Sequence, residues 1–312
     1  MEETPPPGIS DEELEAQIIE DSLCPQDDAV EIALSSLVGI QTVKSQVRGL
    51  RRTLEKQKDV PRHMVFVGNP GTGKTTVARA LARIYYDIGA VRSNHFVEVG
   101  REDLVDRKSE ARTVFKTRRA IDRASGGVLF LKEAYTLLPS TARPRGRDHG
   151  AAALRELARV MSTGDPVMVM SGAPLDLQRV LSSDIGFKGH FLTRIEFPDP
   201  SPEQIARIFM GKLNEKGLVP AEGVTVGYLA ELITSNTDPD WRHERNGRIA
   251  DLLLVGVRAE LKKRTVWDDA ASKGSLSPLK ILSPGSSRMP AFAPEEVFVT
   301  VEDIQNSIVN GM

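Results

Sequence analysis

Cysteine is almost absent from this chain of 312 residues, since Cys24 is its only cysteine. A single cysteine excludes an intrachain disulfide and favours a reducing compartment. No run of about 18 apolar residues occurs, so the pattern indicates no membrane span. The net charge of −2 gives no global attraction to nucleic acid or to an anionic membrane. We therefore expect neither nucleic acid nor a membrane as a partner.

Lys and Arg are also missing from residues 1–31, which contain eleven Asp and Glu residues. We expect residues 1–32 to form an acidic, disordered arm; folding back onto the basic segment 44–62, or binding a basic partner, are the alternatives. An acidic start is the opposite of a transit peptide or signal sequence. We expect a cytoplasmic or nuclear location, and a plastid location stays open if a leader has been trimmed.

Short apolar runs alternate with helical periodicity through the middle of the chain. Between the runs, apolar residues recur three and four apart, as in 77–89 and 152–164. This alternation is typical of an α/β domain with a mostly parallel sheet sandwiched by helices, which we assign to residues 33–200. The runs expected to form its strands are 63–68, 95–100, 127–132, 166–172 and 193–199.

The strand signals stop after residue 200. Ser201 and Pro202 are typical of a helix start, and Gly217 of a helix end. Thr300, followed three residues later by Asp303, indicates the start of the last helix. We expect residues 201–312 to form a small all-helical domain with a flexible Ser/Pro-rich insertion near 266–292. Further helices are expected at 225–235 and 246–263.

A phosphate-binding loop follows the first apolar run. GNPGTGKT, from Gly68 to Thr75, matches G-x-x-x-x-G-K-[ST] between a strand and an amphipathic helix. Its glycines let successive backbone N–H groups surround phosphate oxygens. Lys74 would reach the β- and γ-phosphates of ATP, and the Thr75 hydroxyl would ligate Mg²⁺. The expected ATP- or ADP-binding residues are Gly68, Asn69, Pro70, Gly71, Thr72, Gly73, Lys74, Thr75 and Thr76.

Several segments resemble one nucleotide-binding family. LVGIQTVKSQV (37–47), the phosphate loop, GGVLFLKEAY (126–135) and TRIEFPDPSPEQ (193–204) occur in the order that AAA+ ATPases use. More narrowly, they look like the CbbX/CfxQ group, which includes red-type rubisco activases and stage V sporulation protein K-like proteins. The resemblance implies a RecA-like core with a helical lid, ATP at subunit interfaces, and a ring that acts on a protein client.

The resemblance also implies roles for particular residues. Val38 and Gly39 match the segment that packs on adenine. Glu133 matches the carboxylate that polarises the attacking water, a general-base role. Arg248, in the sequence Asn246-Gly247-Arg248, resembles the sensor-2 arginine that reaches from the lid to the phosphates.

Four positions depart from the family pattern. Lys132 stands where relatives carry the Walker B aspartate, and His190 stands where they carry the arginine finger, for which Arg194 is a candidate substitute. The pore-loop segment 106–115 has no aromatic residue between glycines. Ala173 replaces a tyrosine. Together these departures favour a degenerate ATPase.

Lys132 is the most consequential departure because the missing aspartate helps to hold Mg²⁺. A lysine ammonium about 5 Å from the ion would be repelled by on the order of 6 kcal/mol at an effective dielectric constant near 20. Mg²⁺ binding is therefore doubtful. Two arrangements stay open: Lys132 pairs with Glu133, or it contacts phosphate directly in place of the metal.

Three functions remain open at this point. The first is an ATP-binding subunit with weak or absent hydrolysis, acting as scaffold or regulator in a homo- or hetero-oligomeric ring. The second is an active ATPase that remodels a protein client in the manner of red-type rubisco activase. The third is an interaction module that binds no nucleotide. The sequence identifies neither the client nor the ring partner.

Overall fold

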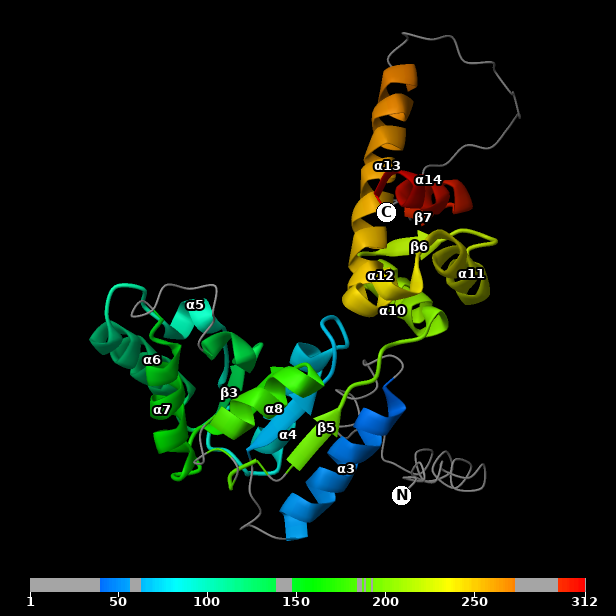
Figure 1. Cartoon of the computed structure of the whole chain (residues 1–312). Helices are drawn as coiled ribbons and strands as arrows, with labels where there is room; N and C mark the ends of the chain where they lie inside the picture. Colours follow the sequence, from blue (N-terminus) through cyan, green and yellow to red (C-terminus); the bar gives the residue numbers. More distant parts are fainter. Residues whose placement is uncertain are drawn as a thin grey trace, which may run out of the picture.

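A computed structural model describes residues 40–56, 63–138, 148–183, 187, 189–191, 193–272 and 297–311. They form an α/β domain and a lid, which we define as residues 201–272 and 297–311, connected after the last strand of the main sheet (Figure 1). The expected acidic arm and most of the expected insertion lie outside these ranges. Within them, no helix is both long enough and apolar enough to cross a bilayer.

The α/β domain contains a five-stranded sheet with all neighbouring strands parallel, in the order β2-β3-β4-β1-β5. Each strand coincides with one of the expected apolar runs, which confirms the α/β fold class. Residues of β1 and β4 are buried throughout, as in a sheet covered on both faces. The strands are β1 (Met64–Val67), β2 (Phe96–Val99), β3 (Val128–Leu131), β4 (Val167–Gly172) and β5 (Thr193–Glu196).

Helices cover both faces of this sheet. Alternation along β1 sends Met64 and Phe66 into one core and Val65 and Val67 into the other. The first core is closed by α3 (Gln41–Lys56) and α4 (Lys74–Asp87). The second core is closed by α5 (Arg101–Leu104), α6 (Glu110–Ala124), η1 (Ala134–Leu137), α7 (Gly150–Met161) and α8 (Pro174–Ser183). This layering fixes which face of the sheet each functional side chain occupies.

The lid has a core of its own and begins where the sequence predicts. Ser201 caps the first helix of the lid, and its side chain accepts a hydrogen bond from the backbone N–H of Gln204. Thr300 and Asp303 form the expected box at the start of the last helix. The lid helices are α10 (Pro202–Glu215), α11 (Val226–Asn236), α12 (Pro239–Arg245), α13 (Arg248–Ser272) and α14 (Val301–Gly311).

The lid differs from the expectation in its detail. It also contains a parallel two-stranded sheet of β6 (Leu218–Pro220) and β7 (Val297–Val299), so it is not purely helical. Strands of three residues are too short to show a period, and their pairing joins segments far apart in the sequence. The helix α13 continues to Ser272, beyond the expected end at residue 263.

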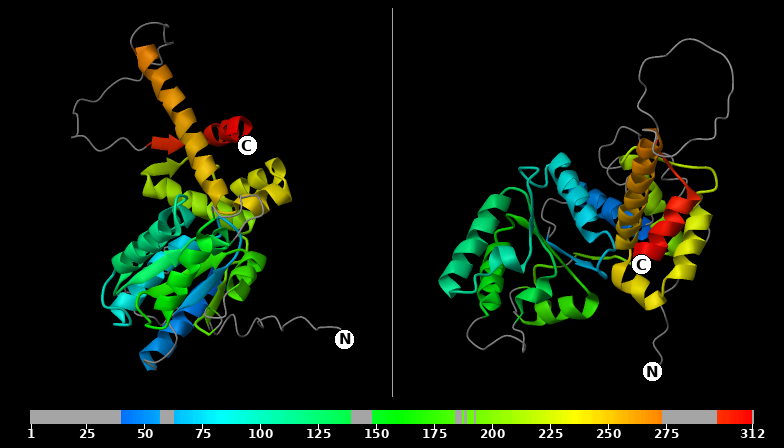
Figure 2. Two further views of the ribbon diagram at one scale, coloured as in Figure 1. Left: turned by 60° about the vertical axis from the view of Figure 1, so that its left-hand side comes forward. Right: turned by 90° about the horizontal axis from the view of Figure 1, so that it is seen from above.

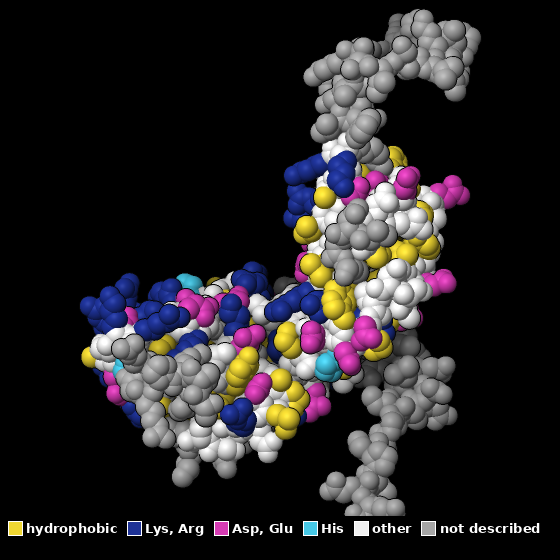
Figure 3. Space-filling model, turned by 45° about the horizontal axis from the view of Figure 1, so that its top comes forward, with side chains coloured by type: hydrophobic (Ala, Val, Ile, Leu, Met, Phe, Trp, Pro, Cys, Tyr) yellow, Lys and Arg dark blue, Asp and Glu magenta, His cyan; other side chains and the backbone are white. Residues whose placement is uncertain are grey.

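The lid and the α/β domain meet at an angle that leaves a notch between them. Figure 2 shows α13 rising from the junction, and Figure 3 shows the surface hollowed where the two parts meet. The carboxyl ends of β1, β3 and β4 open toward this junction, because the residues that follow them line the cavity described next. Ligands of open α/β sheets bind at this edge.

Candidate nucleotide-binding site

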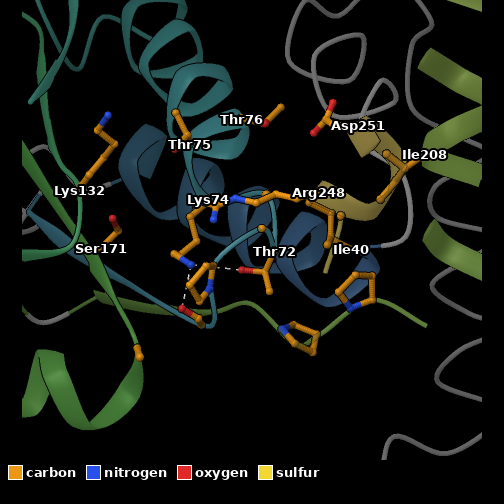
Figure 4. Close-up of a pocket in the computed structure, with 18 of the residues that line it drawn as sticks. Ile40, Thr72, Lys74, Thr75, Thr76, Lys132, Ser171, Ile208, Arg248 and Asp251 are labelled. Carbon is orange, nitrogen blue, oxygen red and sulfur yellow. Dashed lines mark hydrogen bonds between the residues drawn. The ribbon is translucent and has the colours of Figure 1, made fainter. Parts of the chain in front are cut away.

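A cavity of about 570 Å³ lies between the phosphate loop, the ends of β3 and β4, and the lid helices α10 and α13 (Figure 4). Its volume lies within the range of small-molecule sites. Eight of the nine expected loop residues line it: Gly68, Pro70, Gly71, Thr72, Gly73, Lys74, Thr75 and Thr76. The remaining one, Asn69, faces a network beside it. The residues of the predicted phosphate loop are therefore brought together at one cavity.

The lid contacts the phosphate loop through backbone hydrogen bonds. Gly247 N–H donates to the carbonyl of Gly71 at 3.0 Å, and the buried Asn246 donates from Nδ2 to the carbonyl of Pro70 at 3.0 Å. Asn246 adopts a positive φ of 51° to do so. Gly71, with φ of 80°, approaches so closely that a Cβ would lie 2.2 Å from the Arg245 carbonyl oxygen. The loop is thus directly connected to the start of α13.

A side-chain network makes a second connection between the loop and the lid. Asn69 Nδ2 lies 3.0 Å from Asp199 Oδ1 and 3.2 Å from His243 Nε2. Asp199 Oδ2 lies 2.5 Å from His243 Nδ1. Because an amide NH₂ can only donate, the geometry makes Nε2 the acceptor and Nδ1 the donor of the imidazole. Asn69 therefore connects the loop to α12 and to the segment that leads into the lid.

Lys74 is held inside the phosphate loop at the start of α4. Its Nζ donates to the carbonyls of Gly68 at 2.7 Å and Asn69 at 2.5 Å. Burial, and secondly the nearby charge of Arg248, lower the pKa of Lys74 to about 8. An anion beside the ammonium would raise the pKa of Lys74 again, since an opposite charge favours the charged form. The site is therefore electrostatically prepared for phosphate.

Arg248 enters the cavity from the first turn of α13, and Figure 4 shows it reaching toward Lys74. This is the placement that the resemblance implies for the sensor-2 arginine. Apolar residues also line the cavity, among them Ile40, Ile208 and Pro198. Val38 and Gly39, the residues expected at adenine, lie outside the described ranges. Ile40 directly follows them, so the apolar region fits a purine base.

Lys132, at the end of β3, has a partner that the sequence did not suggest. Its Nζ forms an ion pair with Glu98 Oε1 of the neighbouring strand β2 at 3.0 Å. That hydrogen bond, with a smaller opposing effect of burial, raises the pKa of Lys132, so its ammonium stays charged. Lys132 also lines the nucleotide cavity. A pairing of Lys132 with Glu133 is not what the structure shows.

Glu133, the residue after Lys132, also lines the cavity. It leaves β3 in the left-handed region, with φ of 46° and ψ of 54°, a strained conformation for a non-glycine residue. Its charge acts on Lys74 and, with Asp176, contributes to a raised pKa of Tyr135, for which burial is the main cause. The general-base role of Glu133 stays a prediction, and its position in the cavity lining is compatible with it.

The remaining predicted catalytic position lies away from the cavity. Arg194 is on the edge strand β5, more than half exposed, and its Nε lies 2.9 Å from Glu196 Oε1. His190 lies near the amino end of β1, with its ring centroid 6.2 Å from that of His63. In residues 106–115 the aromatic Phe115 lies on α6 and is 63% exposed. Ala173 lines the nucleotide cavity.

Several cavity residues were not predicted from the sequence. Ser171, at the end of β4, is buried and donates to the carbonyl of Leu131 at 3.2 Å. A polar residue ending a buried apolar run was the available signal. Ile208 comes from the lid, and Lys212 pairs with Asp251 across α10 and α13 at 2.7 Å. These contributions come from the lid packing against the loop, so no local pattern marked them.

Comparisons with known proteins agree with this geometry. Residues 64–197 match the ATPase family associated with various cellular activities (AAA). The chain is 33% identical to Protein CbxX, chromosomal, of Cupriavidus necator over 249 residues, covering 75% of this chain and 77% of that protein. The chain belongs to the CbbX/CfxQ group of AAA ATPases. Nucleotide binding follows from this membership.

Two other proteins that resemble this chain carry different names. The ribulose bisphosphate carboxylase/oxygenase activase of Cyanidioschyzon merolae is 37% identical over 190 residues, covering 57% of this chain and 62% of that protein. The ESX-1 secretion system protein EccA1 of Mycolicibacterium smegmatis is 36% identical over 187 residues, covering 56% of this chain and 32% of that protein. This chain therefore spans less than two thirds of either relative.

The cavity of this CbbX/CfxQ protein fits ATP or ADP better than it fits Mg²⁺. The loop, Lys74 and Arg248 could contact phosphates, and the apolar side chains of Ile40 and Ile208 could contact a base. Mg²⁺ in P-loop ATPases is held by the loop Ser/Thr and a Walker B aspartate. Thr75 provides the hydroxyl, but an ammonium occupies the second place.

Proposed function

We propose that this protein is an ATP- or ADP-binding AAA subunit that hydrolyses ATP weakly or not at all. It acts as a scaffold or regulator in a ring, formed with copies of itself or with active relatives. One observation carries the proposal: the phosphate loop is complete and in contact with the lid, while a charged lysine paired with Glu98 stands at the metal-holding position.

Hydrolysis is expected to be poor because phosphoryl transfer depends on charge stabilisation. The retained Glu133 would orient water, but the group that holds the metal is changed, and His190 replaces the arginine finger. A finger arginine alone contributes roughly 10³-fold or more to turnover. Losing two such supports leaves binding intact and turnover very slow, since binding relies on other groups, chiefly the loop, Lys74 and Arg248.

The direct test measures ATP binding by calorimetry and ATP hydrolysis by phosphate release on the same preparation. We expect binding without appreciable turnover, and the change Glu133→Gln should leave the residual rate within about twofold, since chemistry limited by transition-state charge gains little from the base. A turnover rate typical of AAA ATPases that Glu133→Gln abolishes would contradict the proposal.

The second candidate is an active remodelling ATPase in the manner of red-type rubisco activase. The relative of that name and the position of Glu133 beside Lys74 support it. It requires turnover stimulated by sugar-phosphate-inhibited ribulose bisphosphate carboxylase/oxygenase. Changing Arg107 or Lys108, in the segment before α6, should then abolish reactivation, and a lack of effect would count against this candidate.

The third candidate is a module that binds no nucleotide and works through its surfaces. Tight binding of ATP or ADP would exclude it. If neither nucleotide binds under any metal condition, this candidate replaces the first.

A further inference from the structure

The residues at the end of β3 divide between the two faces of the sheet. Lys132 is two residues beyond Phe130, which belongs to the core under α3 and α4. Alternation therefore places Lys132 on the α4 side. Glu98 is the register partner of Phe130 in β2 and lies on that same side. Thr75, the residue expected to ligate Mg²⁺, lies in the first turn of α4, the helix that covers this face of the sheet.

Glu98 is occupied by two cations. Its Oε1 lies 3.0 Å from Lys132 Nζ, and its Oε2 lies 3.3 Å from Arg79 Nη2, one helical turn after Thr75 on α4. The guanidinium of Arg79 additionally lies over the Phe96 ring, 4.8 Å from the centroid. Both carboxylate oxygens are therefore engaged, and Lys132 is held on the α4 side by a fixed partner.

The carboxylates that line the cavity in the described part of the chain lie elsewhere. Glu133 lines the cavity at the start of η1, and Asp176 lines it from α8. Asp251 pairs with Lys212 within the lid, and Glu215 belongs to the last turn of α10. Beside Thr75 the cavity thus offers an ammonium where a divalent ion needs an oxygen ligand.

Mg²⁺ demands octahedral oxygen coordination, usually with one or two carboxylates in addition to phosphate oxygens. The α4 side of this cavity does not fit that requirement, because the carboxylate of Glu98 there is paired with Lys132 and Arg79. It does fit an anion, since Lys132, Lys74 and Arg248 all line the cavity. Cationic side chains can provide the charge that a metal ion normally provides to a polyphosphate.

We propose that this site takes the metal-free polyphosphate of ATP or ADP, with Lys132 in the place of the magnesium ion. The proposal rests on the proposed nucleotide-binding function and specifies the form of the ligand. Glu98 is a positioning residue in this arrangement: it holds Lys132 and does not itself contact the nucleotide.

The decisive measurement is a calorimetric titration of the full chain with ATP, once in EDTA and once in excess Mg²⁺. We expect the dissociation constant in EDTA to equal that in Mg²⁺ within about threefold, or to be lower. Binding that is more than about tenfold tighter with Mg²⁺ would overturn the proposal while leaving the proposed nucleotide-binding function intact. An absence of binding in both conditions would overturn both.

Variants show whether Lys132 is the cause. Lys132→Met removes the charge and keeps the length, and we expect it to weaken binding in EDTA about tenfold. The matched control is Lys263→Met on α13, because Lys263 is an exposed lysine that does not line the cavity. Its Nζ lies 2.7 Å from Glu260 Oε1, and we expect no change in ATP affinity. Equal affinity of Lys132→Met and the parent in EDTA would overturn the role of Lys132. Thermal melting checks that each variant is folded.

A second pair of variants examines the metal preference itself. Lys132→Asp alone would place two carboxylates together, so the informative change is Lys132→Asp combined with Glu98→Gln. We expect this double variant to bind ATP at least about tenfold more tightly with Mg²⁺ than in EDTA. If instead the parent already prefers Mg²⁺ and Glu98→Gln alone removes that preference, Glu98 is a metal ligand and the proposal is wrong.

Discussion

The phosphate loop and the end of β3 line the same cavity but differ in how closely they keep the family pattern. Every motif residue of the loop from Gly68 to Thr75 is retained, and the lid contacts the loop at Pro70 and Gly71. At the end of β3, Glu133 is retained and Lys132 reverses the charge of the residue before it. The phosphate loop therefore keeps the whole family motif, whereas the end of β3 is changed at one of its two charged positions.

We expect nucleotide binding to depend mainly on the loop, and hydrolysis mainly on the end of β3. Loop contacts come from backbone groups and from Lys74 and Arg248, and Lys132 lines the same cavity. The end of β3 instead makes its main contact with Glu98 of the neighbouring strand. A chain can lose charge stabilisation at β3 while its loop and lid remain assembled. The following changes test this separation, from the largest expected effect to the smallest.

The largest effect is expected from Lys74→Met. This change removes the ammonium at the centre of the loop, so we expect ATP affinity to fall about 100-fold by calorimetry, the loss of charge-assisted hydrogen bonds to phosphate. Lys263→Met serves again as the control. If Lys74→Met binds ATP as tightly as Lys132→Met, the two regions do not differ as described.

Alanine substitutions at Gly71 and Gly73 can distinguish the effect of the lid contact on stability from that of backbone strain. Both have a positive φ, 80° and 90°, but only at Gly71 would a Cβ meet the lid, 2.2 Å from the Arg245 carbonyl oxygen. We expect Gly73→Ala to cost ~1 kcal/mol of unfolding free energy from strain, and Gly71→Ala a further ~1–3 kcal/mol from overlap.

Urea denaturation of the two alanine variants, side by side, measures this difference. Equal destabilisation would mean that the lid moves away from the loop at no cost. In that case the Gly247 contact would not hold the two parts together.

Raising the pH should weaken nucleotide binding through Lys74. Its pKa in the free protein is lowered to about 8, and bound phosphate would raise it. Affinity is therefore fully present below pH 8 and is lost above it, by about tenfold per pH unit until the pKa of the complex is reached. Calorimetry between pH 7 and about 9.5 measures the slope. Lys74→Arg, which stays charged, should give a flat profile; a sloping one would assign the effect to another group.

The smallest effect is expected from His63, which directly precedes β1 at the end of the strand away from the phosphate loop. His63 accepts at Nδ1 from the Met168 N–H, at 2.9 Å, and its Nε2 lies 2.8 Å from the Met161 carbonyl, an arrangement suited to the neutral ring. Burial lowers its pKa from 6.5, opposed by the Met161 bond. Stability is therefore complete above pH 6.5 and falls below it, by at most about 1.4 kcal/mol per pH unit.

Urea denaturation at pH 5.5 and 7.5 checks this dependence, and His63→Gln should reduce it. Nucleotide affinity at pH 7.5 should be the same in His63→Gln and the parent. A large loss of affinity would show that this edge is coupled to the cavity after all.

The sequence by itself determined the α/β fold, the positions of the five strands, and the phosphate loop. Apolar runs and helical periodicity mark these elements locally, and the loop motif is contiguous. Helix starts at Ser201 and Thr300 were also correct, because a cap involves residues only three apart. The sequence also determined the position of Lys132, because the apolar run in segment 126–135 ends directly before this lysine.

Only the tertiary structure decided what Lys132 contacts. Glu98 is 34 residues away in the sequence and becomes its neighbour through the pairing of β2 with β3, whose register no local pattern encodes. Two lid residues also have neighbours that only the tertiary structure decided. Ile208 lines the cavity, and His243 contacts Asn69 of the phosphate loop. Which charges meet depends on how strands and domains pack, and that packing is set by many weak contacts distributed over the whole chain.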